Sequence, residues 1–235
     1  EAEMLACKSI LFGSEEHLYE INKSMECVSF NAIKASSKIA EEKDSYPNFN
    51  GSEWSKGLLP IDFANEKAKE LTPLAESVYT EEEYKELREQ VSKGMRNGYL
   101  MAIAPTSSIS ILVGTTQAIE PIYRKKWFEE NLSGLIPVVA PKLSPETWEY
   151  YPSAFDVEQL NIIKAASVRQ KWIDQGQSTN IFMRSDKASG KYLNEIYMTA
   201  WEYGLKSTYY LRSQSPDAKK AEETIDRSIE CMGCQ

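Results

Sequence analysis

The first residues with the potential for chemistry are Pro105, Thr106, Ser107 and Ser108, which follow an uncharged apolar run at 101–104. The run predicts a buried strand, and Pro105 would end its ladder because proline has no N–H to donate. Hydroxyls and free backbone amides donate to anionic oxygens, and the N-terminus of a following helix would add its dipole. The pattern fits a phosphate-holding loop, but no Gly-rich loop or lysine of the P-loop kind is present. An ordinary strand-to-turn junction with a Ser/Thr cap is therefore the simpler interpretation.

The second group is the Cys-x-x-Cys pair of Cys231 and Cys234. It could be half of a zinc site, although zinc requires four ligands, or an incidental pair. It could also be a tethered dithiol that enters a pocket, reduces a disulfide by exchange and is then reduced by a thioredoxin-like donor. The remaining candidate ligands lie far away near the N-terminus, at Cys7, His17 and Cys27. For these residues a structural or solvent-facing role is the simpler interpretation.

The third group is the adjacent pair Tyr209 and Tyr210, within a predicted strand at 206–211. Adjacent side chains of a strand point to opposite faces, which favours one tyrosine in the core and one at its edge. In a bent segment the two phenols could stack and pass a radical by coupled proton and electron transfer. The spacing leaves both interpretations open.

Composition limits the class of protein. The 235 residues suffice for one large domain or two small ones, and 42% hydrophobic residues permit a sizeable core. A net charge of −8 argues against broad nucleic-acid binding, which needs a basic face. No apolar run approaches the roughly 20 residues that span a bilayer. With four cysteines and no visible secretory signal, we expect a reducing, cytoplasmic location.

Two helices are predicted in the first half of the sequence. Ser14 caps the first, which carries one apolar stripe. Thr80 and Glu83 form a capping box that begins the second. The inward faces predicted for the two helices are, in order, Leu18, Ile21, Met25, Val28, Ala32, Ala35 and Ile39, and then Tyr84, Leu87 and Val91.

The second half alternates helical and strand patterns, which is typical of an α/β protein. Residues 122–155 look irregular, and Glu120, before Pro121, is most simply a turn or capping carboxylate. The predicted elements are a helix capped by Asp156 and closed near Gly176, a strand at 179–183, a helix at 193–201 with Trp201 inward, and the strand at 206–211.

A change of character near residue 213 divides the sequence. Residues 1–212 carry the periodic apolar patterns, whereas 213–235 are polar with almost no large apolar residues. Such a segment cannot bury enough surface to offset its ordering entropy. We therefore expect a folded domain over 1–212 and a flexible tail over 213–235 that carries the cysteine pair.

The motifs, taken in order, resemble the C-terminal portion of the large (alpha) subunit of class I ribonucleoside-diphosphate reductases. The resemblance covers nearly the whole sequence, and so many short matches in the right order make chance agreement very improbable. The stretches that carry it are FNAIKAS at 30–36, GLLPID at 57–62, MRN at 95–97, PTSS at 105–108, IEP at 119–121, LSG at 132–134, QKWIDQ at 170–175, LKSTYY at 205–210 and the terminal Cys231-x-x-Cys234.

The resemblance implies an α/β fold, namely the C-terminal part of the ten-stranded α/β barrel of these subunits. It implies that Pro105, Thr106, Ser107, Ser108 and Ile109 hold the substrate diphosphate, with the two serines as side-chain donors. Ile109 departs from the hydroxyl residue common at that position in the family. One phosphate contact there would be made by the backbone alone or be absent.

The same resemblance implies radical chemistry that reduces ribonucleoside diphosphates to deoxyribonucleoside diphosphates. Tyr209 and Tyr210 would relay a radical from a metal-containing small (beta) subunit. Cys231 and Cys234 would re-reduce an active-site disulfide and receive electrons from thioredoxin or glutaredoxin. The chain itself would bind no cofactor or metal, and nucleotide effectors would bind the N-terminal part of the alpha subunit.

One family motif is missing, the Asn-x-Cys-x-Glu loop whose cysteine forms the catalytic thiyl radical; Cys7 and Cys27 lie in the wrong contexts to replace it. We therefore expect the chain to be inactive alone, as a fragment or as one piece of a split reductase with an N-terminal alpha partner. The alternative is a non-catalytic assembly or binding module. A glycyl-radical reductase is disfavoured because the C-terminus lacks that motif.

Overall fold

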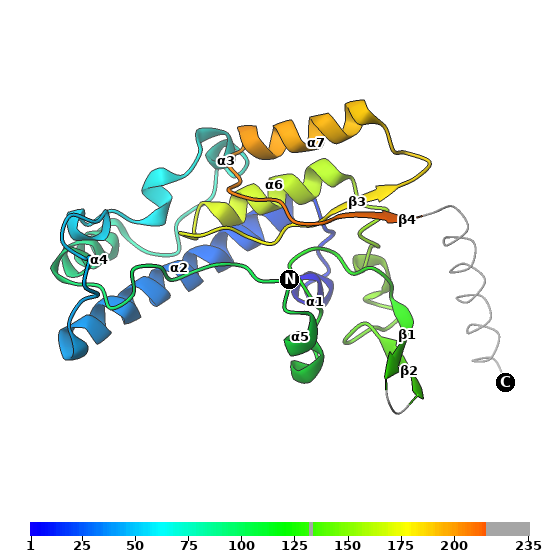
Figure 1. Cartoon of the computed structure of the whole chain (residues 1–235), viewed down its shortest axis with the longest axis horizontal. Helices are drawn as coiled ribbons and strands as arrows, with labels where there is room; N and C mark the ends of the chain where they lie inside the picture. The colour runs from blue at the N-terminus through cyan, green and yellow to red at the C-terminus, as the bar shows by residue number, and fades with distance from the viewer. Residues whose placement is uncertain (132–133, 215–235) are drawn as a thin grey trace.

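The computed structural model describes residues 1–131 and 134–214. They form one array of helices with two small sheets at one end (Figure 1). The elements are α1 Ala2–Cys7, α2 Glu15–Lys43, η1 Trp54–Lys56, η2 Pro60–Phe63, α3 Glu66–Glu70, α4 Glu81–Lys93, α5 Ser107–Val113, β1 Lys126–Asn131, β2 Gly134–Val139, η3 Trp148–Tyr150, α6 Gln159–Gln170, β3 Ile181–Arg184, α7 Gly190–Glu202 and β4 Leu211–Gln214.

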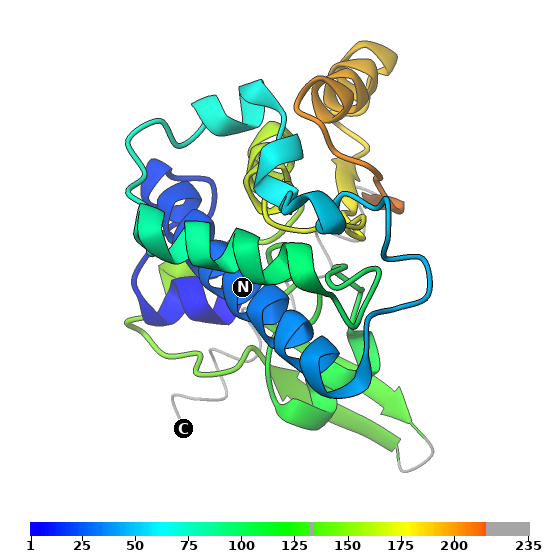
Figure 2. The same ribbon diagram turned by 90° about the vertical axis from the view of Figure 1, so that its left-hand side faces the viewer.

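The two predicted helix starts in the first half are confirmed. The Ser14 side chain accepts a hydrogen bond from the His17 backbone at the start of α2. Thr80 and Glu83 form the expected reciprocal capping box of α4. Helix α4 lies along α2 in Figure 2, with Leu87 and Val91 buried between them and the adjoining loops. Local capping signals therefore place both helices correctly.

The apolar stripe predicted for α2 is wrong in its second half. Val28 and Ile39 are 55% and 40% exposed, while polar side chains on a neighbouring face are buried. Ser37, for example, donates to the Gly94 carbonyl at 2.8 Å. Polar groups tolerate burial when they find partners. The segments after α3 and α4 supply partners for Glu26, Ser36 and Ser37, whereas Asn22 accepts from the Trp172 indole at 3.0 Å. The buried polar residues of the helix are His17, Asn22, Glu26, Ser29, Ser36 and Ser37.

Helix α6 forms the centre of the array and lies between α2 and α7 (Figure 1). Its predicted cap is wrong by two residues: Glu158 accepts from the Leu160 backbone, whereas Asp156 forms an ion pair with Arg184 at 2.8 Å. In the neighbouring helix α7, Trp201 is exposed rather than inward. The α6 side chains that are almost fully buried are Ile162, Ile163, Ala165, Ala166, Val168 and Arg169.

Strands β3 and β4 form a parallel pair in which Ile181 faces Leu211. The strand predicted at 179–183 is confirmed from Ile181 onward, since β3 begins two residues later than predicted. The last strand begins at Leu211 rather than at residue 206. Lys206 and Ser207 are held by side-chain bonds instead, to the carbonyls of Asp174 (2.6 Å) and Gln177 (3.0 Å). These two side-chain hydrogen bonds hold the first residues of the predicted strand, where the described residues show no strand pairing.

The prediction that the segment 122–155 is irregular is wrong in part. Strands β1 and β2 form an antiparallel hairpin there, with Lys126 opposite Val139. The prolines of this segment suggested a loop, but a two-stranded hairpin consists only of edges, where a missing N–H is tolerated. Among the described residues, no helix combines the length and the apolar character needed to cross a bilayer.

Candidate functional site

The apolar run before Pro105 forms an extended segment but not the predicted strand. It exchanges hydrogen bonds with residues 175–178: Ile103 donates to the Gly176 carbonyl at 3.2 Å, and Ser178 donates to the Ile103 carbonyl at 2.8 Å. The result is one isolated parallel bridge between Ile103 and Gln177. Pro105, two residues further on, has no N–H to continue the ladder.

A helix does follow the hydroxyl cluster. Thr106 has left-handed backbone angles (φ 54°), and α5 begins at Ser107. Ser107 and Ser108 are exposed in the first turn of α5, where backbone N–H groups lack intrahelical acceptors. We call residues 105–109 the hydroxyl loop. The Ala118 N–H donates to the Pro105 carbonyl at 3.1 Å, so the segment after α5 returns to the start of this loop. The arrangement presents hydroxyls and amides together, as an anion requires.

Ile109, which stands where the family commonly has a hydroxyl residue, is also exposed on α5. Its aliphatic side chain offers no hydrogen bond, so any polar contact at this position comes from the backbone. Further exposed apolar side chains on the same short helix are Ile111, Leu112 and Val113.

The rings of Tyr209 and Tyr210 lie against each other, with centroids 4.1 Å apart and planes at 51°. The expectation that they point to opposite faces is wrong, because the pair lies just before β4 and not inside a regular strand. Both rings are about half exposed. A hydrogen bond with Tyr210 raises the pKa of the Tyr209 phenol. The two rings are therefore in contact, but they are tilted and not stacked as the second interpretation required.

Residues 175–181 connect the hydroxyl loop with the tyrosine pair. One side of this segment bonds to residues 101–103, as described above. The other side bonds to the tyrosines: Tyr209 donates to the Thr179 carbonyl at 2.8 Å, and Ile181 donates to the Tyr210 carbonyl at 2.9 Å. One short extended segment is therefore bonded on one side to residues 101–103, which lead into the hydroxyl loop, and on the other side to the backbone of the tyrosine pair.

Glu120 is a buried carboxyl group next to segment 175–181, and the sequence interpretation missed it because a carboxylate before proline most often lies in a turn or caps a helix. The side chain is 1% exposed, and its Oε1 accepts from both nitrogens of Asn180, the backbone N at 2.5 Å and Nδ2 at 3.2 Å. Burial raises the pKa of the Glu120 carboxyl. The available signal was its place between Ile119 and Pro121 in the IEP motif.

A second buried polar cluster surrounds Arg169, which is fully buried. Its guanidinium donates to the Glu1 carboxylate at 2.8 Å and to Gln177 Oε1 at 3.1 Å. His17 is also buried: its Nδ1 accepts from the Gly13 backbone, and its Nε2 lies 3.0 Å from Glu1 Oε1. These contacts give His17 a structural role.

The other candidate ligands do not gather. Cys7 and Cys27 are exposed free thiols, and no cluster of His, Cys, Asp and Glu suited to a metal ion occurs within 1–131 and 134–214. Cys231 and Cys234, like the rest of the predicted tail from residue 215, lie outside the described residues.

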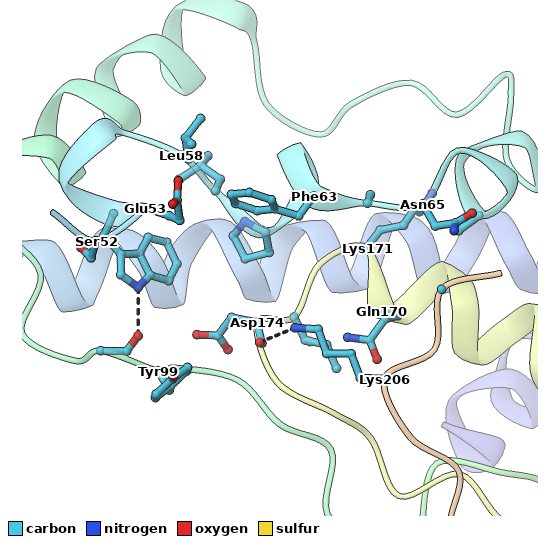
Figure 3. Close-up of a pocket in the computed structure, with 18 of the residues that line it drawn as sticks. Ser52, Glu53, Leu58, Phe63, Asn65, Tyr99, Gln170, Lys171, Asp174 and Lys206 are labelled. Carbon is cyan, nitrogen blue, oxygen red and sulfur yellow. Dashed lines mark hydrogen bonds between the residues drawn. The ribbon is translucent and has the colours of Figure 1, made fainter. Parts of the chain in front are cut away.

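A cavity of about 820 Å³ lies away from these groups, between the η1–η2 region and the segment after α6 (Figure 3). Asp174, Lys171 and Lys206 line it, together with the exposed aromatic rings of Phe63 and Tyr99. None of the site residues predicted from the sequence lines this cavity. Its polar groups already have partners within the chain, since the Asp174 carboxylate accepts from the backbones of Leu100 and Met101.

Comparison with known proteins identifies the family. The family model described as the ribonucleotide reductase barrel domain matches residues 1–211. The chain belongs to the ribonucleotide reductase barrel-domain family. The match covers the folded part predicted from the sequence, and it confirms the large-subunit resemblance and the barrel fold class.

Curated relatives of this chain carry the name ribonucleoside-diphosphate reductase subunit alpha. Two proteins of Helicobacter pylori, from strains J99 and 26695, are 60% and 59% identical over 100% of this chain and 30% of their own length. A protein of Treponema pallidum is 42% identical over 90% of this chain and 23% of its own length. The chain thus spans less than a third of the length of each of these three relatives.

Proposed function

We propose that this chain is the part of a ribonucleoside-diphosphate reductase alpha subunit that supplies the substrate-phosphate loop, a tyrosine radical relay and a tail dithiol. The observation that carries the proposal is the placement of the hydroxyl loop and the touching Tyr209–Tyr210 rings on the two sides of segment 175–181. The identity to alpha subunits over the whole chain supports it.

The substrate would be a ribonucleoside diphosphate. Its phosphates would accept hydrogen bonds from the Ser107 and Ser108 hydroxyls and from the backbone N–H groups of residues 106–109, at the start of α5. The Ile109 position contributes only its backbone. Because α5 has no acidic residue in its first turn, no carboxylate of that turn opposes the anion.

The radical would come from the small beta subunit and pass through Tyr210 and Tyr209. Ring contact at 4.1 Å suits this relay, since each transfer exchanges an electron and a phenolic proton between neighbouring groups. A cysteine of the remaining alpha subunit would then become a thiyl radical and remove the 3′ hydrogen of the ribose.

The reaction balances through thiols. The 2′ hydroxyl leaves as water, two thiols of the remaining subunit are oxidised to a disulfide, and the 3′ hydrogen returns to carbon. Cys231 and Cys234 would reduce that disulfide by exchange, and thioredoxin or glutaredoxin would reduce the tail in turn. We expect the whole cycle to need the N-terminal part of the alpha subunit as a partner.

The test is formation of dCDP from CDP by this chain with the beta subunit, with and without the remaining alpha part. We expect turnover only when that part is present. Tyr209→Phe and Tyr210→Phe, which keep the ring but remove the proton needed for oxidation, should each stop turnover without unfolding the chain. Tyr99→Phe, at another exposed tyrosine, is the matched control.

Normal turnover of either relay variant would contradict the relay. No turnover in any combination, with assembly verified, would favour the alternative of a non-catalytic assembly or binding module.

A further inference from the structure

The buried contact between Glu120 and Asn180 occupies a special place in the chain. Asn180 lies between Thr179 and Ile181, whose backbone groups bond to Tyr209 and Tyr210 at 2.8 Å and 2.9 Å. Glu120 Oε1 fixes both the backbone N–H and the side-chain amide of Asn180. The carboxylate therefore holds the one residue between the two backbone anchors of the tyrosines.

Glu120 is also tied to the hydroxyl loop. Two residues before it, the Ala118 N–H donates to the Pro105 carbonyl at 3.1 Å, and Ala118 itself has a left-handed backbone (φ 58°). A backbone in this region is strained for alanine and persists only where surrounding contacts hold it. One short segment thus connects the loop at Pro105 with the strand that anchors the tyrosines.

The contact between Glu120 and Asn180 leaves several buried polar atoms without hydrogen bonds within the described part of the chain. Glu120 Oε2 and Asn180 Oδ1 are both buried and have no hydrogen-bond partner among the described residues, and the same holds for the hydroxyls of Thr116 and Thr179. Folded proteins seldom leave such atoms unpaired. The retained bonds to Asn180 therefore point to a positional requirement.

We propose that Glu120 is a positioning residue, which sets the Tyr209–Tyr210 pair relative to the hydroxyl loop by holding Asn180 through Oε1. The inference rests on the proposed radical relay and deepens it. Glu120 acts through Asn180 and the backbone of segment 179–181. What it must provide is a hydrogen-bond acceptor at Oε1, and a neutral amide provides one equally well.

The test uses Glu120→Ala, which removes the acceptor, and Glu120→Gln, which keeps it. Glu26→Ala is the matched control, because Glu26 is also 1% exposed and accepts from the Val78 backbone at 3.1 Å and from the Tyr84 hydroxyl at 2.9 Å. Each variant is made in the assembled alpha subunit with its beta partner. The readouts are hydrogen exchange of the Tyr209 and Ile181 amides, and kcat and KM for CDP.

We expect Glu120→Ala to accelerate exchange at both amides and to lower kcat by about a hundredfold with little change in KM, which is the size expected when a reacting group moves by about 1 Å. Glu120→Gln should restore slow exchange and turnover. Glu26→Ala should leave exchange at these amides unchanged. If Glu120→Ala does not fold, Asn180→Ala, which removes only the Nδ2 bond, should give an intermediate acceleration.

The inference is overturned if Glu120→Ala exchanges both amides at the wild-type rate. Where Glu120→Ala does not fold, the same result in Asn180→Ala overturns it. Equal acceleration of exchange in Glu26→Ala would also overturn it. If Tyr209→Phe stops turnover while Glu120→Ala behaves as wild type, only the positioning role fails. If Glu120→Ala accelerates exchange but both it and Tyr209→Phe turn over normally, the relay fails and the positioning contact stands.

Discussion

At the scale of single residues, the described part of the chain buries several charged groups in different ways. Glu120 and Arg169 use short hydrogen bonds to fixed partners. Lys171 is also buried, and its ammonium donates to the Thr72 hydroxyl at 2.8 Å. Burial lowers the pKa of Lys171 to about 8, while the nearby Glu26 carboxylate acts in the opposite direction.

The lowered pKa of Lys171 predicts a pH dependence of stability. Between about pH 8 and 10 the unfolded chain still binds the lysine proton and the folded chain has lost it, so the free energy of unfolding rises with pH across this window. We expect Lys171→Met to remove this rise, as measured by urea unfolding at several pH values. A rise of equal size in both proteins would show that the folded lysine keeps its ordinary pKa.

The tail cysteines carry a second residue-scale prediction. If Cys231 and Cys234 pass electrons to an internal disulfide, Cys231→Ser and Cys234→Ser should stop turnover supported by thioredoxin. Turnover with a small dithiol, which reaches the disulfide by itself, should persist. The check is dCDP formation with each reductant. Loss with both reductants would contradict the role of the tail.

At the scale of elements, glycines decide where helices can end against their neighbours. Gly204 follows α7 with φ 79°, and a Cβ there would lie 2.6 Å from Asn65 Cβ. Gly114 follows α5 with nearly the same φ, 77°, but has open space around it. The two positions share the backbone requirement and differ in the space available.

We therefore expect Gly204→Ala to lower the free energy of unfolding more than Gly114→Ala. Both substitutions place a side chain at positive φ, which costs about 1–3 kcal/mol, and only Gly204→Ala adds a clash with Asn65. Urea unfolding of the two variants measures the difference. Equal losses would mean that the region of Asn65 moves away without cost.

At the scale of the whole molecule, the chain exposes apolar surface on α5 through Ile109, Ile111, Leu112 and Val113. A contiguous apolar patch marks a contact with other protein surface or a liability for association. The relatives are more than three times longer than the region they share with this chain. The remaining alpha subunit is the surface that we expect to cover α5.

This patch predicts association of the chain when it is produced alone. Leu112→Gln should increase the monomeric fraction, measured by light scattering, because it removes the most exposed apolar side chain of α5. Leu74→Gln makes the same change at an exposed leucine outside α5 and should have little effect. A monomeric wild-type chain would argue against the patch as an interface.

Features that depend on residues close together in the chain could be predicted without the structure. The Ser14 cap and the Thr80–Glu83 box are local, because their hydrogen bonds join residues three apart, and both helices begin where predicted. The alternation of helical and strand patterns and the short motifs that carry the family resemblance are also local. They sufficed for the α/β class and the family, which the match over residues 1–211 confirms.

Features that depend on partners distant in the sequence became visible only in the folded chain. Glu120 became a buried acceptor because Asn180, 60 residues away, brings two donors to it. Ser37 on α2 is buried because the Gly94 carbonyl meets it, and Tyr209 and Tyr210 face each other because segment 179–181 anchors their backbone. A hydrogen bond compensates burial only when its partner is in place. The residue pattern of one segment does not specify which distant residue will be that partner. These contacts therefore could not be predicted from the sequence.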